Sequence, residues 1–259
     1  MGAIVHDSQV TDSSSGWLST RETATKLRVS EATVRRWGDQ GALPARRVGK
    51  RGDRRFRSEH VEGFVVPGRR QPPQPAGGAS SVSMGGQQVA AGTHLAALYD
   101  TDAGRVRLTV PFLAEGLLAG QRCFLLAQGE ELDDHLESLG LYPGLDVDGA
   151  LASGLLVTGG GPGKTVRVAL DFFEKILWSA LDSKAAFVRI VGEMASVRAQ
   201  FASEREMLTF EELVNMTFKR FPCVALCQYD VRKFSGQAVL KALRAHPDVY
   251  GSALGLLLK

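Results

Sequence analysis

The sequence predicts two folded units of different class. One is a small helix-turn-helix domain with a β wing over residues 17–66, and the other is an α/β domain with a mostly parallel sheet over 93–259. Three observations predict this division. Residues 17–70 hold fourteen Lys or Arg against six Asp or Glu, although the whole chain has a net charge of only +3. A Pro- and Gly-rich tract then predicts a flexible linker over 67–92. Beyond it, apolar runs of strand length alternate with amphipathic stretches of helix length.

The first unit begins after a polar segment, residues 1–16, whose composition predicts disorder. Ser19 and Thr20 are candidate capping residues at the start of a first helix, on which Leu27 lies at helical spacing. Ser30 is a candidate N-cap for a second helix, which Gly41 is expected to end. These signals predict two short helices joined by a tight turn.

Such a pair of helices is typical of proteins that insert the second helix into the major groove of DNA. Its first residues would then face the bases, which makes Thr33, Arg35 and Arg36 the candidate readers. Arg46–Val48 and Arg54–Arg57 flank a glycine-bearing turn and predict a β-hairpin, which we call the wing. The candidate DNA-binding set is Ser30, Thr33, Arg35, Arg36, Arg46, Arg47, Lys50, Arg51, Arg54 and Arg55.

The run Val29–Trp37, followed by Gly-Ala-Leu-Pro at 41–44, resembles the winged helix-turn-helix of MerR-type regulators and is closer still to the BldC and excisionase branch. The resemblance implies DNA contacts from Thr33 and Arg35 on the helix and from Arg54 and Arg55 on the wing. MerR proteins follow this module with a long dimerising helix, whereas this chain continues into the Pro- and Gly-rich tract. Self-association would therefore come from another part of the chain.

The second unit is expected to be a three-layer α/β domain, because alternating strands and helices imply a parallel sheet covered on both faces. The predicted strands are 94–99, 122–127, 155–157, 187–191, 224–229 and 250–257. The predicted helices are 103–119, 130–139, 166–181, 204–219 and 236–245.

Ligands in such sheets bind beyond the carboxyl ends of the strands. The residues at or after these ends are Tyr99, Asp100, Glu193, Gln228, Tyr229 and Asp230. Together they are the candidate ligand-binding residues, although polar side chains at strand ends also serve to hydrogen-bond nearby backbone.

Residues 158–165, Thr-Gly-Gly-Gly-Pro-Gly-Lys-Thr, nearly match a phosphate-binding P-loop, but Thr158 stands where the first glycine belongs. Lys164 at the start of a helix is a candidate anion ligand. Against triphosphate binding, the first strand ends in Asp100-Thr101-Asp102, where two carboxylates would repel phosphate. We expect a structural glycine loop here and leave an anion site open.

Residues 93–250 resemble the sensory domain of DcmR-like regulators, the MEDS domain. The most specific stretch is Cys227-Gln228-Tyr229-Asp230, and the other stretches include 94–99, 110–113, Gly192-Glu193-Met194 and His246-Pro247. The resemblance implies a RecA- or KaiC-like core with a degenerate nucleotide loop, acting as a ligand sensor.

The three cysteines predict no disulfide framework, and no secretory signal or apolar span of membrane length is visible. We therefore expect a cytoplasmic protein associated with the nucleoid. Cys223 and Cys227 would lie about 13 Å apart along one strand and could not share an ion, so no metal site is predicted.

The leading hypothesis is a DNA-binding transcriptional regulator, not an enzyme, whose second domain senses a ligand or mediates self-association. Double-stranded DNA is the expected partner, either for a homo-oligomer or for copies bound cooperatively on repeated sites. No cofactor is assigned, and a small-molecule or nucleotide effector stays open. The alternative is a nucleotide-binding ATPase or switch tethered to DNA. The effector, the operator and the direction of regulation are not encoded in a recognisable motif.

Overall fold

The structure is a computed structural model that describes residues 16–49, 52–62, 64, 81–84 and 87–246. The chain divides into two compact units, Met1–Arg70 and Gln71–Lys259, and each is described by itself. The predicted disordered segment 1–16, except its last residue, and the predicted strand 250–257 lie outside the described residues.

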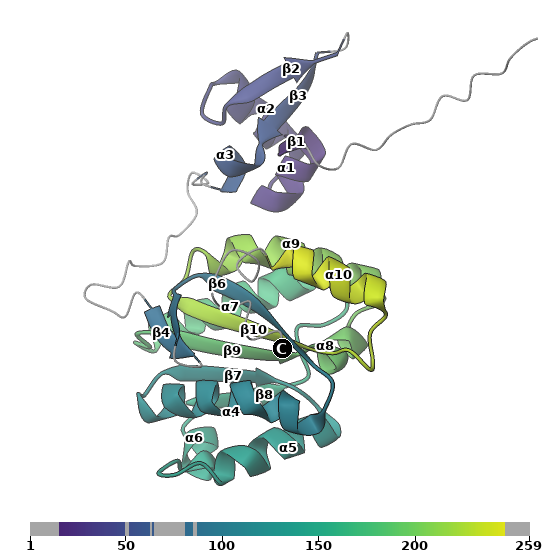
Figure 1. Ribbon diagram of the computed structural model, residues 1–259. Coiled ribbons are helices and arrows are strands. Elements are labelled where there is room, and N and C mark those ends of the chain that lie inside the picture. Colours follow the sequence, from purple (N-terminus) through teal and green to yellow (C-terminus); the bar gives the residue numbers. More distant parts are fainter. Residues whose placement is uncertain (1–15, 50–51, 63, 65–80, 85–86, 247–259) are drawn as a thin grey trace, which may run out of the picture. The chain divides into compact units, whose positions relative to one another are not determined.

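The N-terminal unit is a three-helix domain with a small antiparallel sheet (Figure 1). Its elements are β1 (Trp17–Ser19), α1 (Thr20–Leu27), α2 (Glu31–Asp39), β2 (Ala45–Val48), β3 (Asp53–Arg57) and α3 (Ser58–Glu62). The strands pair in the order β1-β3-β2. The two predicted helices and the wing hairpin are therefore observed.

Local hydrogen bonds fix the ends of both helices. Ser19 and Glu22 form a capping box at the start of α1, with the Glu22 N–H donating to Ser19 Oγ and the Ser19 N–H donating to Glu22 Oε2. Arg28 ends α1 in the left-handed region, at φ 57°. Two residues later Ser30 Oγ accepts the Thr33 N–H and starts α2. The turn is thus short because one cap follows directly on the other.

The core of this unit is formed by apolar side chains from the helices and the wing. Val34 and Trp37 on α2 are buried, as are Leu43, Phe56 and Val61. Phe56 lies on β3, so its burial fixes which face of the wing turns toward the helices. Trp37 is a core residue, as its helical spacing with Val34 suggests.

The prediction of a linker over 67–92 is wrong for nearly half of that range. Residues 81–92 include β4 (Ser81–Met84) and β5 (Gln87–Ala90), which pair antiparallel. Val82, Met84 and Val89 are buried in the core of the C-terminal unit. These alternating apolar residues gain enough burial to order a segment whose Gly and Ser content is typical of linkers.

The C-terminal unit is built on a five-stranded parallel sheet in the order β6-β10-β9-β7-β8. Its strands are β6 (Thr93–Tyr99), β7 (Arg122–Leu126), β8 (Leu156–Gly159), β9 (Val188–Glu193) and β10 (Cys223–Asp230). The central strands β9 and β10 are buried along their whole length. This agrees with their nearly continuous apolar sequence, which parallel strands covered on both faces require.

Helices cover both faces of the sheet (Figure 1). The helices are α4 (Asp102–Leu118), α5 (Gly129–Gly140), α6 (Val147–Ala152), α7 (Val166–Asp182), α8 (Met194–Gln200), α9 (Glu204–Phe218) and α10 (Gly236–Ala245). α4, α5 and α6 lie on one face, and α7, α9 and α10 lie on the other. Of these, the short helices α6 and α8 were not predicted. In the described part of the chain, no helix has both the length and the apolar character needed to cross a membrane.

Candidate functional site

The candidate DNA interface centres on α2, which exposes Arg35 and Arg36 on the side away from Val34 and Trp37. Arg35 Nη2 donates to Glu31 Oε2 over 2.6 Å, one helical turn earlier. This ion pair is exposed, so it contributes only about 0.3–0.5 kcal/mol and exchanges readily for a phosphate.

An acidic residue connects α2 to the wing. Arg54 Nη2 donates to both carboxylate oxygens of Asp39, over 2.6 and 2.8 Å, and Arg47 Nη2 donates to Asp39 Oδ1 over 3.1 Å. The hydrogen bond from Arg54 lowers the pKa of Asp39. The Arg54 side chain is 19% exposed and that of Arg47 is 62% exposed. Arg54 therefore positions the wing against α2, while Arg47 stays accessible to DNA.

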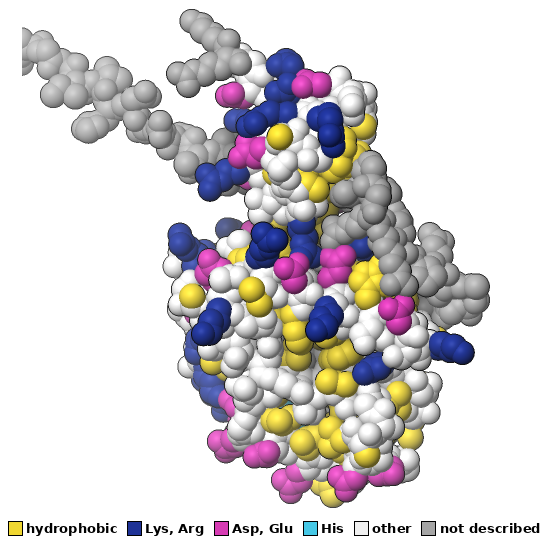
Figure 2. All heavy atoms as spheres, turned by 180° about the vertical axis from the view of Figure 1, so that it is seen from behind, with side chains coloured by type: hydrophobic (Ala, Val, Ile, Leu, Met, Phe, Trp, Pro, Cys, Tyr) yellow, Lys and Arg dark blue, Asp and Glu magenta, His cyan; other side chains and the backbone are white. Residues whose placement is uncertain are grey.

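The candidate wing cations do not share one face. Arg46 pairs with Arg55 and Arg47 pairs with Arg54 in the β2–β3 register. Neighbouring residues of a strand point to opposite faces, so Arg46 and Arg55 lie opposite Arg47 and Arg54. Lys50 and Arg51 lie outside the described residues. Dark blue Lys and Arg side chains are prominent on the N-terminal unit at the top of Figure 2.

Ser30 and Thr33 contact each other at the start of α2. Ser30 Oγ lies 2.9 Å from Thr33 Oγ1 and accepts the Thr33 N–H over 3.1 Å. Their structural role is to cap the helix, which leaves the accessible positive charge of α2 to Arg35 and Arg36.

The candidate ligand site of the C-terminal unit lies at the carboxyl edge of the sheet. Glu193, the last residue of β9, is fully buried, and neither carboxylate oxygen has a hydrogen-bond partner of good geometry among the described residues. The Tyr99 hydroxyl and the Ala195 N–H lie near enough to stabilise the charge in part. Burial nevertheless dominates and raises the pKa of Glu193 to about 7.

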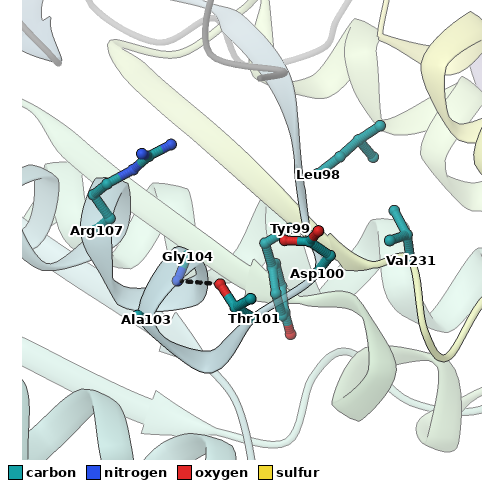
Figure 3. A pocket seen from close by; sticks show the side chains of 8 residues that line it. All are labelled: Leu98, Tyr99, Asp100, Thr101, Ala103, Gly104, Arg107 and Val231. Atoms are coloured by element: carbon teal, nitrogen blue, oxygen red, sulfur yellow. Dashed lines mark hydrogen bonds between the residues drawn. The ribbon is translucent and has the colours of Figure 1, made fainter.

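Tyr99 connects this carboxyl group to a pocket. Its hydroxyl is buried without a hydrogen bond of good geometry, and burial followed by the charge of Glu193 raises its pKa. Its ring lines a pocket of about 440 Å³. The lining residues are Leu98, Tyr99, Asp100, Thr101, Ala103, Gly104, Arg107 and Val231, all labelled in Figure 3.

The pocket combines apolar walls with polar groups at the start of α4. Leu98 and Val231 lie at one end and Arg107 at the other (Figure 3). Thr101 Oγ1 accepts the Gly104 N–H over 3.1 Å, which caps the helix. Pockets that combine apolar walls with a few placed polar groups are typical of small-molecule sites.

Two further polar candidates at this edge are engaged within the protein. Gln228 Nε2 lies 3.3 Å from His135 Nε2 on α5. Asp230 accepts from Arg232 Nε and Nη2, each over 2.8 Å, and these hydrogen bonds lower its pKa. Arg232 Nη2 also donates to Asp102 Oδ1. The Asp230 carboxylate therefore orders the loop after β10.

Two predicted ligand-binding residues do not lie with Tyr99 and Glu193 at the carboxyl edge of the sheet. Tyr229 is fully buried on the other face of β10, where its hydroxyl donates to Glu211 Oε2 over 3.1 Å. The period of two in a strand separates it from Gln228 and Asp230. Lys164 is exposed and follows β8, the edge strand opposite β6 in the sheet. The predicted cluster therefore lacks both.

The loop that resembles a P-loop is occupied by the protein itself. Glu206 Oε2 accepts the Val166 N–H at the start of α7 over 3.1 Å, so a carboxylate already stands where phosphate would bind. A Cβ at Gly160 would lie 2.1 Å from Gln128 Nε2. Close packing therefore accounts for glycine at this position.

The sequence analysis does not predict two buried residues near the carboxyl edge of the sheet, Arg105 and His135. Arg105 on α4 is buried and makes ion pairs with Asp134 and Asp102. His135 on α5 is buried, and its Nδ1 lies 2.6 Å from the Glu131 carbonyl oxygen. Burial, as the largest effect, lowers the pKa of His135. Both residues lie within ordinary amphipathic helices, where a charged residue is expected to face solvent.

Replacing Glu193 by glutamine is expected to remove a pH dependence of stability. The folded carboxyl group has a pKa of about 7, whereas the ordinary value is 4.5. Between these two pH values the folded protein therefore binds more protons than the unfolded protein does. The contribution of Glu193 to the free energy of unfolding is therefore fully present below the ordinary pKa of 4.5. It is lost as pH rises through about 7, and the loss is at most about 3 kcal/mol. Glu193→Gln is expected to be less sensitive to pH than the parent across this window.

The measurement is hydrogen exchange of the slowest β9 and β10 amides at about pH 5 and about pH 8, corrected for intrinsic rates. Asp230→Asn is the matched control, because the pKa of Asp230 is lowered. Equal pH dependence in the parent and Glu193→Gln would contradict the assignment.

Comparisons with known proteins agree with the two-unit organisation. A model described as a helix-turn-helix domain matches residues 17–65, and one described as MEDS, the methanogen/methylotroph DcmR sensory domain, matches 93–247. The transcriptional repressor DcmR of Methylorubrum extorquens is 37% identical over 244 residues, which cover 90% of this chain and 91% of DcmR. The flagellar accessory protein FlaH from Methanocaldococcus jannaschii is 12% identical, with a TM-score of 0.39, over 60% of this chain and 69% of FlaH.

Proposed function

Because the chain belongs to the DcmR-like family, in which a helix-turn-helix domain is joined to a MEDS sensory domain, we propose that it controls transcription by binding operator DNA through α2 and the wing. Both matched domains and the repressor relative are regulatory, so an enzyme is not indicated. We further propose that the chain represses transcription, as the name of its relative states for that protein.

The observation that carries the DNA-binding proposal is the arrangement of cations around α2. Arg35 and Arg36 are exposed on the helix, and Asp39 holds Arg54 and Arg47 of the wing beside its end. A helix in the major groove with a neighbouring hairpin on the backbone would use these groups for bases and phosphates. A hairpin directly after the second helix also supports the MerR- or BldC-like subtype.

The helix-turn-helix module is expected to bind DNA in pairs. One small module buries only about 600–1,000 Å² of protein surface on DNA, which is too little for high specificity. We propose that two copies bind neighbouring half-sites, through pairing of the C-terminal units or through cooperative binding on repeats.

The pocket beside Tyr99 is the proposed effector site. Tyr99 and Asp100 line it, while Glu193 behind Tyr99 has a pKa near neutrality and can change protonation when the Tyr99 hydroxyl moves. A small molecule with both an apolar part and a hydrogen-bonding group would suit these walls.

The experiment for the DNA proposal is selection of bound duplexes from a random library by the full chain, followed by hydroxyl-radical footprinting. We expect a selected motif and protections repeated at about 10–10.5 base pairs, one helical turn. Binding without any selected motif or footprint would refute an operator-binding function.

A further inference from the structure

Four potential metal ligands converge on the face of the sheet that α9 covers. His94 comes from β6, Cys227 from β10, Glu211 from α9, and His246 follows α10. All four side chains are buried, and one donor atom from each lies within 4.8 Å of the others. Taken in sequence order, successive ligands are 117, 16 and 19 positions apart along the chain, so only the fold brings them together.

The distances between the donor atoms match one small ion. His94 Nε2 lies 3.1 Å from Cys227 Sγ, 3.0 Å from His246 Nε2 and 3.6 Å from Glu211 Oε2. His246 Nε2 lies 3.1 Å from Glu211 Oε2. A tetrahedral zinc ion with ordinary Zn–N and Zn–S lengths separates its ligand atoms by roughly 3.3–3.7 Å. These four separations therefore need to change by only a few tenths of an ångström, and the remaining donor pairs lie within 4.8 Å of each other.

The protons of both imidazole rings are fixed on the outer nitrogen. Asn215 Nδ2 donates to the Ala245 and Glu211 carbonyl oxygens, so Asn215 Oδ1 faces His94 Nδ1 and accepts its proton over 3.1 Å. His246 Nδ1 donates to the Ala242 carbonyl oxygen over 2.6 Å. Each neutral ring then points the lone pair of Nε2 into the cluster, which is the orientation that metal-bound histidines adopt.

Two imidazole lone pairs 3.0 Å apart repel each other unless a cation lies between them. A single proton can join only two of the four donor atoms, whereas a metal ion accepts all four. Tyr229 also donates to Glu211 Oε2, as outer partners of metal-bound carboxylates do.

We propose that one Zn²⁺ ion is bound by His94, Glu211, Cys227 and His246. The ion would cross-link β6, β10, α9 and the end of α10. Binding releases the Cys227 thiol proton to solvent. One thiolate, one carboxylate and two neutral imidazoles then balance the charge of the ion, which suits a buried site. The thiolate and imidazole donors favour Zn²⁺ over Mg²⁺ and Ca²⁺.

The site is closed. His94, Glu211 and Cys227 line a small void of about 10 Å³, whose other walls are mostly apolar. This volume is at the lower limit for one water molecule. Four protein ligands without an open position are typical of a structural zinc site, so the ion is not expected to do chemistry.

The test uses the full chain produced in minimal medium supplemented with zinc or, separately, with cobalt, so that the ion is present while the protein folds. We expect about one zinc per chain by mass spectrometry of the metal content. The cobalt form is expected to show intense visible bands of tetrahedral coordination and a thiolate-to-cobalt charge-transfer band.

The paired variants are Cys227→Ser and Cys223→Ser, two buried cysteines of β10. Cys223→Ser is expected to keep the metal and the charge-transfer band, and Cys227→Ser is expected to lose the band. If Cys227→Ser does not fold, X-ray absorption at the zinc edge of the parent decides the question through a first shell of one sulfur and three nitrogen or oxygen atoms. Metal-free protein from both media, or a band that Cys227→Ser retains, would overturn the proposal.

Discussion

Replacing Arg35 and Arg36 together by alanine is expected to weaken binding to the selected operator by roughly 30- to 1,000-fold, which corresponds to about 2–4 kcal/mol. Both side chains are exposed on α2, and Arg35 is held only by an exposed ion pair with Glu31. Their loss removes base or phosphate contacts while the buried face of α2 is unchanged. Fluorescence anisotropy with the full chain at fixed salt measures the effect.

The matched control is Arg167→Ala with Arg205→Ala, which removes two exposed charges from the C-terminal unit. It changes the net charge equally and is expected to leave affinity within about twofold, because single surface charges contribute little. If both double variants lose the same affinity, the interaction depends on total charge, and the interface on α2 is wrong.

Replacing Arg189 by alanine is expected to destabilise the C-terminal unit by about 3–5 kcal/mol. This residue of β9 is 4% exposed, and its guanidinium contacts several elements. Arg189 Nε donates to Gln121 Oε1 and Nη1 to the Phe112 carbonyl oxygen, each over 2.7 Å. The guanidinium also lies 4.8 Å from the centre of the Phe112 ring. Truncation removes both hydrogen bonds, one of them buried, and leaves a cavity beside the Phe112 ring.

Gly116 provides a double-mutant cycle for this arginine. A Cβ at Gly116 would lie 2.6 Å from Arg189 Cδ, so Gly116→Ala alone is expected to be destabilising. In the Arg189→Ala background the clash with the Arg189 side chain is absent. The double variant is therefore expected to be destabilised by less than the sum of the two single variants. Hydrogen exchange of the slowest β9 and β10 amides is expected to quicken by roughly 100-fold or more in Arg189→Ala. Strict additivity would show that the two positions do not interact.

The sequence predicts most helices and strands of both units because their caps and buried faces are visible in their own residues. The Ser19 and Ser30 caps mark α1 and α2, and nearly continuous apolar runs mark β9 and β10. α8 is missed because Met194 starts it directly after β9, without a turn residue between them. The strand pair β4–β5 is missed because the core that buries Val82 and Val89 comes from elsewhere in the chain.

The candidate sites are less predictable because they depend on tertiary contacts. Strand ends predict that Tyr99 and Glu193 lie at one edge of the sheet, because carboxyl ends of parallel strands share an edge, and the two residues end β6 and β9 there. The period of two along β10 predicts that Tyr229 lies on the opposite face of the sheet from Gln228 and Asp230. By contrast, the sequence suggests only Cys223 as a neighbour of Cys227, and nothing local in it indicates that Glu211 and His246 lie beside Cys227.

The salt dependence of operator binding tests the central claim, that a localised basic surface of the N-terminal unit binds duplex DNA. Four to six phosphate contacts predict a slope of roughly −4 to −5 in log K against log salt concentration for the full chain. Arg35→Ala with Arg36→Ala is expected to make the slope shallower by up to about 2. A slope near zero, or an equal slope in the parent and this variant together with unchanged affinity, would contradict the account.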